Sequence, residues 1–201
     1  MIAMLSWNEA SGWPAEPDGG TGSPPLFPVA DPEVHELVAT HFRVVWRALR
    51  RFGVRPALLD DAAQQVFATL FSKRALIEPG KERAFLLGIA FRVAANLRRS
   101  EARKPEIGLE DSELPAHPDP NPEELLELKR RRALLDEVLD ALPEEQRAVF
   151  VLFELEGCST SEIAEALELP MGTVASRLRR ARGRFAAKVR ELQKLEKGVG
   201  T

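Results

Sequence analysis

From Pro32 onward, apolar side chains recur every three or four positions, and this period constrains the fold more than any other feature of the chain. Such spacing places the apolar side chains on one face of an α-helix, which must then pack against another element. No segment alternates apolar and polar residues over the length of a strand, so we expect no β-sheet. The period therefore predicts an all-α protein.

Two proline-rich segments divide the expected helices into two groups. Residues 1–30 contain five prolines and no base, which predicts a disordered lead. Residues 105–124 contain five more prolines among acids, which is typical of an extended linker. We therefore expect two small helical domains, over residues 31–104 and 125–195, joined by a flexible acidic linker.

The net charge of −3 is distributed unevenly along the chain. Residues 31–104 hold 14 Lys and Arg against 8 Asp and Glu, whereas residues 105–128 hold 8 acids and no base. Residues 129–201 hold 14 bases against 12 acids. Two basic blocks separated by an acidic strip indicate an anionic partner such as nucleic acid.

Several classes of protein are excluded or disfavoured by what the sequence does not contain. No apolar run approaches the roughly 20 residues of a membrane-spanning helix, so we expect no membrane insertion. Cys158 is the only cysteine, which excludes an internal disulfide and favours the cytoplasm. Phosphate-binding loops, metal-ligand clusters and nucleophile motifs are absent, so we expect no enzyme activity, catalytic residue, metal or cofactor.

A helix-turn-helix is expected near the C-terminus. Ser159 and Glu162 have the spacing of a capping box, and a short apolar helix follows them. Residues 169–172 then form a turn, and a longer helix opens near Thr173. In this arrangement the second helix lies in the major groove of DNA.

The second helix is basic on the side away from its apolar stripe. Residues 172–190 hold seven bases and no acid. An arginine near the helix N-terminus can donate two hydrogen bonds to guanine, while other bases neutralise phosphates. The alternative is a solvated basic face. The candidate DNA-reading residues are Thr173, Ser176, Arg177, Arg180 and Arg184.

Two earlier helices have polar faces of opposite character. The helix expected from about Glu82 to Arg103 has an outer stripe that suits a DNA backbone, or else is simply a solvated basic face. The helix expected over residues 60–71 is acidic and polar, which favours a protein partner or a solvated face. The basic stripe consists of Arg92, Asn96, Arg99 and Arg103, and the acidic face of Asp60, Asp61, Gln64 and Gln65.

Four motifs in series resemble bacterial RNA polymerase sigma factors. Residues 60–67 (DDAAQQVF) resemble the helix by which these proteins bind core polymerase, and residues 84–99 look like the helix that binds the −10 promoter element. Residues 142–147 and 172–182 are similar to the domain that reads the −35 element. The small two-domain form is similar to the extracytoplasmic-function (ECF) group.

The resemblance implies partners and residue roles. Core RNA polymerase would be bound through the β′ clamp helices and β, promoter DNA would be melted at −10, and a separate anti-sigma factor is a further possible partner. The loop at residues 76–83 would help to hold the −10 strand, and the linker would thread toward the polymerase channels. Polymerase contacts would come from Asp60, Asp61, Gln64, Gln65 and Phe67, −10 contacts from Arg92, Asn96, Arg99 and Arg103, and −35 contacts from Thr173, Ser176, Arg177, Arg180 and Arg184.

Two other functions stay open from the residues alone. A free-standing helix-turn-helix regulator would explain residues 142–192 but would leave the face around Asp61 without a role. An adaptor that acts only through protein contacts would have no need for the basic helix at 172–190.

Overall fold

The computed structural model describes residues 32–73, 80–103 and 122–198, and in these ranges the chain is helical without a strand. The all-α fold class is therefore confirmed. The expected lead at 1–30, most of the linker and residues 76–79 of the loop at 76–83 lie outside the described residues. The elements are α2 (Pro32–Arg51), the 3-10 turn η1 (Pro56–Leu58), α3 (Leu59–Lys73), α4 (Glu82–Glu101), α5 (Pro122–Asp140), α6 (Glu144–Phe150), the π-helical turn η3 (Val151–Leu155), α7 (Thr160–Leu167) and α8 (Met171–Gly198).

Local signals account for most of the helix boundaries. Gly53 has φ +90, a backbone conformation that favours glycine, and it follows the end of α2. Ser159 caps α7 in a reciprocal capping box with Glu162, and these hydrogen bonds lower the pKa of the Glu162 carboxyl. Helix α8 begins at Met171, two residues before the expected start, because the carbonyl of Pro170 accepts hydrogen bonds from the first turn.

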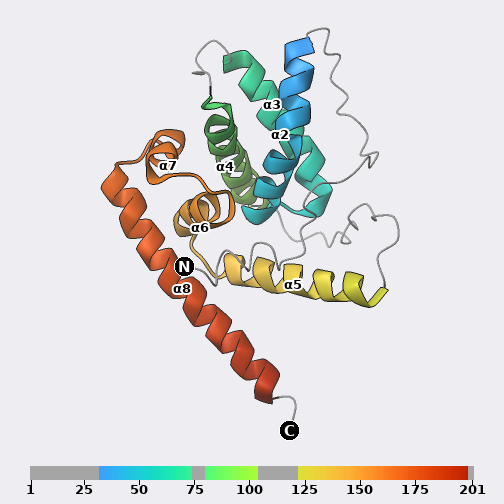
Figure 1. Ribbon diagram of the computed structural model, residues 1–201, viewed down its shortest axis with the longest axis vertical. Coiled ribbons are helices and arrows are strands. Elements are labelled where there is room, and N and C mark those ends of the chain that lie inside the picture. The colour runs from blue at the N-terminus through green and yellow to red at the C-terminus, as the bar shows by residue number, and fades with distance from the viewer. Residues whose placement is uncertain (1–31, 74–79, 104–121, 199–201) are drawn as a thin grey trace.

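The described helices form two units along the chain (Figure 1). In the N-terminal unit (residues 32–103), α2, α3 and α4 pack against one another. In the C-terminal unit (residues 122–198), α6 and α7 pack on α8, and α5 contacts α8. Among the described residues, no helix is long and apolar enough to cross a lipid bilayer.

The two units pack against each other in this structure. Their buried apolar residues form one continuous cluster, and α4 packs directly against α7. The approach is close at Gly88, where an added Cβ would lie 2.6 Å from the backbone oxygen of Ala166. A glycine on α4 therefore allows contact with the backbone of the C-terminal unit.

Arg147 of α6 joins the units from within the shared interior. Its side chain is 2% exposed, and its Nε donates a hydrogen bond of 2.6 Å to the backbone oxygen of Arg51. Its Nη1 pairs with the carboxylate of Asp140. The guanidinium lies against Gly53, where an added Cβ would be 3.0 Å from Arg147 Nη1. Burial lowers the pKa of Arg147, although the Asp140 carboxylate opposes the shift.

We expect Gly53→Ala to lower the free energy of unfolding by about 1–3 kcal/mol. The alanine would have to adopt the positive φ of this site, which is unfavourable for a residue with a side chain, and its Cβ would crowd the Arg147 guanidinium. Urea denaturation followed by circular dichroism measures the change. Gly183→Ala is the matched control, because Gly183 lies in α8 with nothing within 4 Å of its added Cβ. Equal stability of Gly53→Ala and the parent would contradict the strain argument.

Candidate protein and nucleic-acid interfaces

The acidic face of α3 lies open to solvent. Asp60 and Asp61 occupy the first turn of the helix, where negative charge favours the positive end of the helix dipole. Asp60 accepts a hydrogen bond of 3.1 Å from Trp46 Nε1, whereas Asp61 and Gln65 are exposed and Gln64 is half-buried. Because α3 packs mainly on α2 and α4, the C-terminal unit leaves this face uncovered (Figure 1).

Phe67, the fifth residue assigned to the polymerase contact, lies inside the N-terminal unit. Its side chain is 0% exposed and stacks on Phe42 with ring centroids 6.2 Å apart. A surface contact by Phe67 would require the unit to open. We therefore place Phe67 among the residues that hold α3 in position.

The basic stripe of α4 faces the C-terminal unit at one end. Arg92 Nη2 donates to Glu168 Oε1 at 2.7 Å and to the backbone oxygen of Ala166 at 3.1 Å. Further along, Arg99 donates to the side-chain oxygen of Asn96 at 2.6 Å, and both residues are exposed. Arg103 follows the end of α4 and is also exposed.

Helices α7 and α8 adopt the helix-turn-helix order that the sequence predicts. The turn contains Glu168, which has φ 55 and ends α7 in a left-handed conformation. On α8, Ser176 Oγ donates to the backbone oxygen of Thr173 at 3.0 Å, and both side chains are half-buried. Arg180 and Arg184 are exposed and make no ion pair with another described residue.

Part of the positive charge of α8 is paired within the C-terminal unit. Arg177 pairs with Glu145 at 2.6 Å, and Arg182 pairs with Glu154 at 2.6 Å. Lys188 makes further pairs with acids of α5 and α8. Only some of the seven bases in residues 172–190 therefore remain for an external anion.

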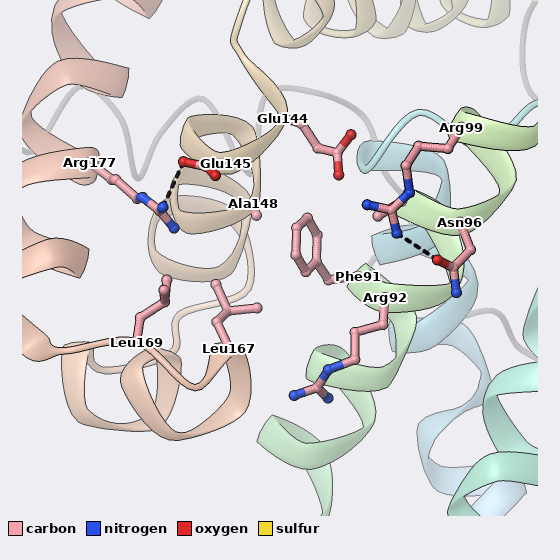
Figure 2. A pocket seen from close by; sticks show the side chains of 11 residues that line it. Phe91, Arg92, Asn96, Arg99, Glu144, Glu145, Ala148, Leu167, Leu169 and Arg177 are labelled. Carbon is pink, nitrogen blue, oxygen red and sulfur yellow. Dashed lines mark hydrogen bonds and ion pairs between the residues drawn. The ribbon is translucent and has the colours of Figure 1, made fainter. Parts of the chain in front are cut away.

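The α4 stripe and the start of α8 line the same cavity (Figure 2). The cavity has a volume of about 450 Å³ and lies between the two units. Arg92, Asn96 and Arg99 enter it from α4, and Arg177 and Glu145 approach from the opposite side. The structure thus brings together residues that the sequence assigns to different promoter elements.

Glu156, which sequence reasoning did not single out, holds the largest ionic cluster between the units. Its side chain is 0% exposed and lies among three arginines of the N-terminal unit. Arg51 Nη1 is 2.7 Å from its Oε1, and Arg47 Nη2 is 2.8 Å from its Oε2. Arg83 Nη2 lies 3.5 Å from Oε2 and also donates to the backbone oxygen of Glu156. We call these four residues the Glu156 cluster.

Burial and charge act in opposite directions on this cluster. Desolvation lowers the pKa of Arg51, and the nearby Glu156 carboxylate raises it in return. The neighbouring Cys158 thiol is also buried, and burial raises its pKa to about 11. No sequence signal distinguishes Glu156 from exposed glutamates, because its arginine partners lie about 70 to 110 residues away along the chain.

Family models match both units. The sigma-70 region 2 model matches residues 37–104, and the sigma-70 region 4 model matches residues 132–185. The chain is 32% identical over 187 residues to the ECF RNA polymerase sigma factor SigE of Mycolicibacterium smegmatis. The matched region covers 90% of this chain and 72% of that protein. It is 40% identical over 72 residues to the ECF RNA polymerase sigma-E factor of Escherichia coli K12. This matched region covers 36% of this chain and 38% of that protein.

Two solved structures have a similar fold. The structure of CnrH in complex with the cytosolic domain of CnrY matches with a TM-score of 0.58 and 25% identity, over 79% of this chain and 88% of that one. The sigma factor RpoE in complex with the anti-sigma factor NepR from Bartonella quintana matches with a TM-score of 0.60, over 79% of this chain and 97% of that one. Because the sequence identity to the RpoE structure is 18%, this match shows a similar fold only.

Proposed function

Because this chain belongs to the ECF group of RNA polymerase sigma factors, which bind core polymerase and direct it to promoters, we propose that three of its surfaces divide this work. The domain predicted over residues 31–104, which contains the N-terminal unit, would bind polymerase and the −10 element. The domain predicted over residues 125–195, which lies within the C-terminal unit, would bind the −35 element. The acidic segment at 105–124 would thread through polymerase between them.

The polymerase surface is the acidic face of α3. Asp61, Gln64 and Gln65 are spaced so that their side chains lie on one side of the helix, and Asp60 extends this face. Its position, uncovered by the other described helices, supports the assignment, since a partner can reach it without any rearrangement of those helices. We assign it to the β′ clamp helices.

The DNA surfaces are the α4 stripe and the N-terminal half of α8. A base that leaves the duplex during melting exposes edges that Asn96 can read, while the flanking arginines bind the strand's phosphates. On α8, the exposed Arg180 and Arg184 suit base and phosphate contacts in a major groove. The half-buried Thr173, Ser176 and Arg177 complete this surface.

The protein would itself catalyse nothing, since polymerase carries out the chemistry. Its place of action would be the bacterial cytoplasm, where promoters and polymerase are found. Both solved structures are of complexes with a second protein, one of them an anti-sigma factor. We therefore propose a separate anti-sigma factor as a further partner.

Run-off transcription tests the function directly. Purified core polymerase would transcribe fragmented DNA from the source genome with and without this protein. We expect new transcripts that begin downstream of a shared −35/−10 pair only when the protein is present. If duplex DNA were bound by the protein alone and no new start appeared, a free-standing regulator would replace this proposal.

We expect Arg180→Ala to weaken −35 binding by about 1–3 kcal/mol if its guanidinium reaches a base edge. Because the side chain makes no ion pair with another described residue, its removal leaves no buried partner behind. Fluorescence anisotropy of holoenzyme on labelled −35 duplexes measures the loss. Arg190→Ala, an exposed base later on α8, is the control and would change binding only slightly. Equal losses at the two positions would remove Arg180 from the reading surface.

A further inference from the structure

A large apolar side chain lies exposed at the start of the second helix of the helix-turn-helix. Met171 is the first residue of α8, and its side chain is 58% exposed. Among the described residues, the other large hydrophobic side chains that are exposed are Leu126 and Leu195. Single apolar residues on a protein surface are ordinary, so the exposure of Met171 decides nothing by itself. What distinguishes Met171 is its place on α8.

The N-terminal end of α8 is the part of the helix that would meet the bases. In a helix-turn-helix, the N-terminal residues of the second helix contact base edges in the major groove. The carbonyl of Pro170 accepts hydrogen bonds from the amides of Thr173 and Val174 at 2.8 and 3.1 Å, which fixes the first turn. Gly172 is exposed, and no atom of the described residues lies within 4 Å of a Cβ added there. A DNA duplex can therefore approach this turn closely, with Met171 beside it.

The chemistry of methionine limits what its side chain can recognise in a major groove. Its thioether is only a weak hydrogen-bond acceptor, so it is unsuited to the donors and acceptors of the base edges. Of the groups that the base pairs present in this groove, the C5-methyl of thymine is the apolar one. Methionine is also flexible and polarizable, which lets it adapt to a methyl group whose position is fixed by the duplex.

We propose that Met171 is a specificity-determining residue of the −35 surface, which selects thymine through apolar contact with its C5-methyl group. This inference deepens the proposed function and rests on the assignment of α8 to the −35 element. The other residues assigned to this surface are polar and recognise bases or phosphates by hydrogen bonds. Met171 adds a contact that only a methyl group satisfies.

The spacing along α8 places the selected thymine at one edge of the element. Met171 lies nine residues before Arg180, which is about 13 Å along the helix axis. Successive base pairs lie about 3.4 Å apart along a duplex, so this distance corresponds to about four base-pair steps. We therefore expect the thymine to lie several base pairs from the base that Arg180 contacts.

Removal of a single methyl group from the DNA tests the contact directly. The full-length protein, with and without core polymerase, would first enrich duplexes from a random-sequence library, which defines the bound element. Each thymine of that element would then be replaced in turn by deoxyuridine, which lacks only the C5-methyl. Fluorescence anisotropy with labelled duplexes measures the affinity. We expect one replacement, at an edge of the element, to weaken binding about fourfold, as for the loss of one buried methyl group.

Met171→Ala shows whether this side chain is the partner of the methyl group. We expect the variant to bind the thymine and deoxyuridine duplexes equally, because the apolar contact is lost with either DNA. Met171→Leu would regain the preference for thymine, since leucine restores a large apolar side chain. Circular dichroism would verify that each variant folds.

Leu195→Ala is the matched control for Met171→Ala. Leu195 is 59% exposed on the same helix, so its replacement removes an equally accessible apolar side chain. It lies 24 residues after Met171, about 36 Å along the helix axis, and therefore far from the end that enters the groove. Leu195→Ala should keep the parent's affinity and its preference for thymine over deoxyuridine.

Two results would overturn the inference: no deoxyuridine replacement weakens binding, or the preference for thymine persists in Met171→Ala. A selection that enriches no element would also overturn it, since Met171 would then have no base to select. The proposed function fails in a different way. If the protein enriches an element by itself but run-off transcription yields no new start, a free-standing regulator replaces that proposal, and the same duplexes still test Met171.

Discussion

Asp61→Arg is expected to abolish binding to core polymerase and, with it, promoter-dependent transcription. Asp61 is exposed on the face of α3 that the other described helices leave uncovered. Replacement reverses the charge at the centre of the proposed contact and places a cation at the positive end of the helix dipole. A pull-down with purified core polymerase and run-off transcription measure the two losses.

The control for Asp61→Arg is a charge reversal elsewhere on the same unit. Glu36 is an exposed acid of α2, nearly three turns before the Trp46 that contacts Asp60. Glu36→Arg should bind polymerase like the parent. Neither variant should bind single-stranded DNA less tightly than the parent does. If Asp61→Arg still captures polymerase at the parent's level, the polymerase surface lies elsewhere.

Phe67→Ala is expected to cost about 3–5 kcal/mol of stability, which is a large share of the 5–15 kcal/mol typical of a folded domain. The side chain is 0% exposed and stacks on Phe42, so its removal leaves a cavity between α2 and α3. Thermal unfolding should show a midpoint lower by roughly 6–20 °C. Polymerase binding would fall with the folded fraction.

Phe67→Leu separates a packing role from a direct contact. Leucine fills most of the same space, so we expect stability to fall much less than in Phe67→Ala and polymerase binding to persist. The informative comparison is binding at a temperature where both variants are folded. Loss of binding by a fully folded Phe67→Leu protein would restore Phe67 to the contact surface.

Local sequence signals predicted the helices well, because each depends on neighbours along the chain. The apolar period located α2, α3 and α4, and the Ser159 capping box located the start of α7. The boundary errors have local causes too. Helix α8 starts at Met171 because the carbonyl of Pro170, not a side chain near Thr173, accepts its first hydrogen bonds.

The packing of the two units could not be predicted in the same way. It depends on Glu156 meeting arginines more than 70 residues away, and on Arg147 reaching the backbone of Arg51. A single sequence shows the excess of bases in residues 31–104 but not what neutralises it. We interpreted that excess as a sign of an external anion, whereas acids of the C-terminal unit pair with six of those bases.

The π-helical turn η3 makes the number of residues in this segment matter as well as their identity. The Glu156 amide donates to the carbonyl of Val151, five residues earlier, so the turn contains one residue more than an α-helical turn would. Loss of one residue between Val151 and Leu155 would rotate Glu156 by about 100° relative to α6. Surface loops commonly absorb such deletions during evolution. Here a deletion would turn the carboxylate away from its arginines, so descendants that keep the Glu156 cluster must inherit the length of this segment.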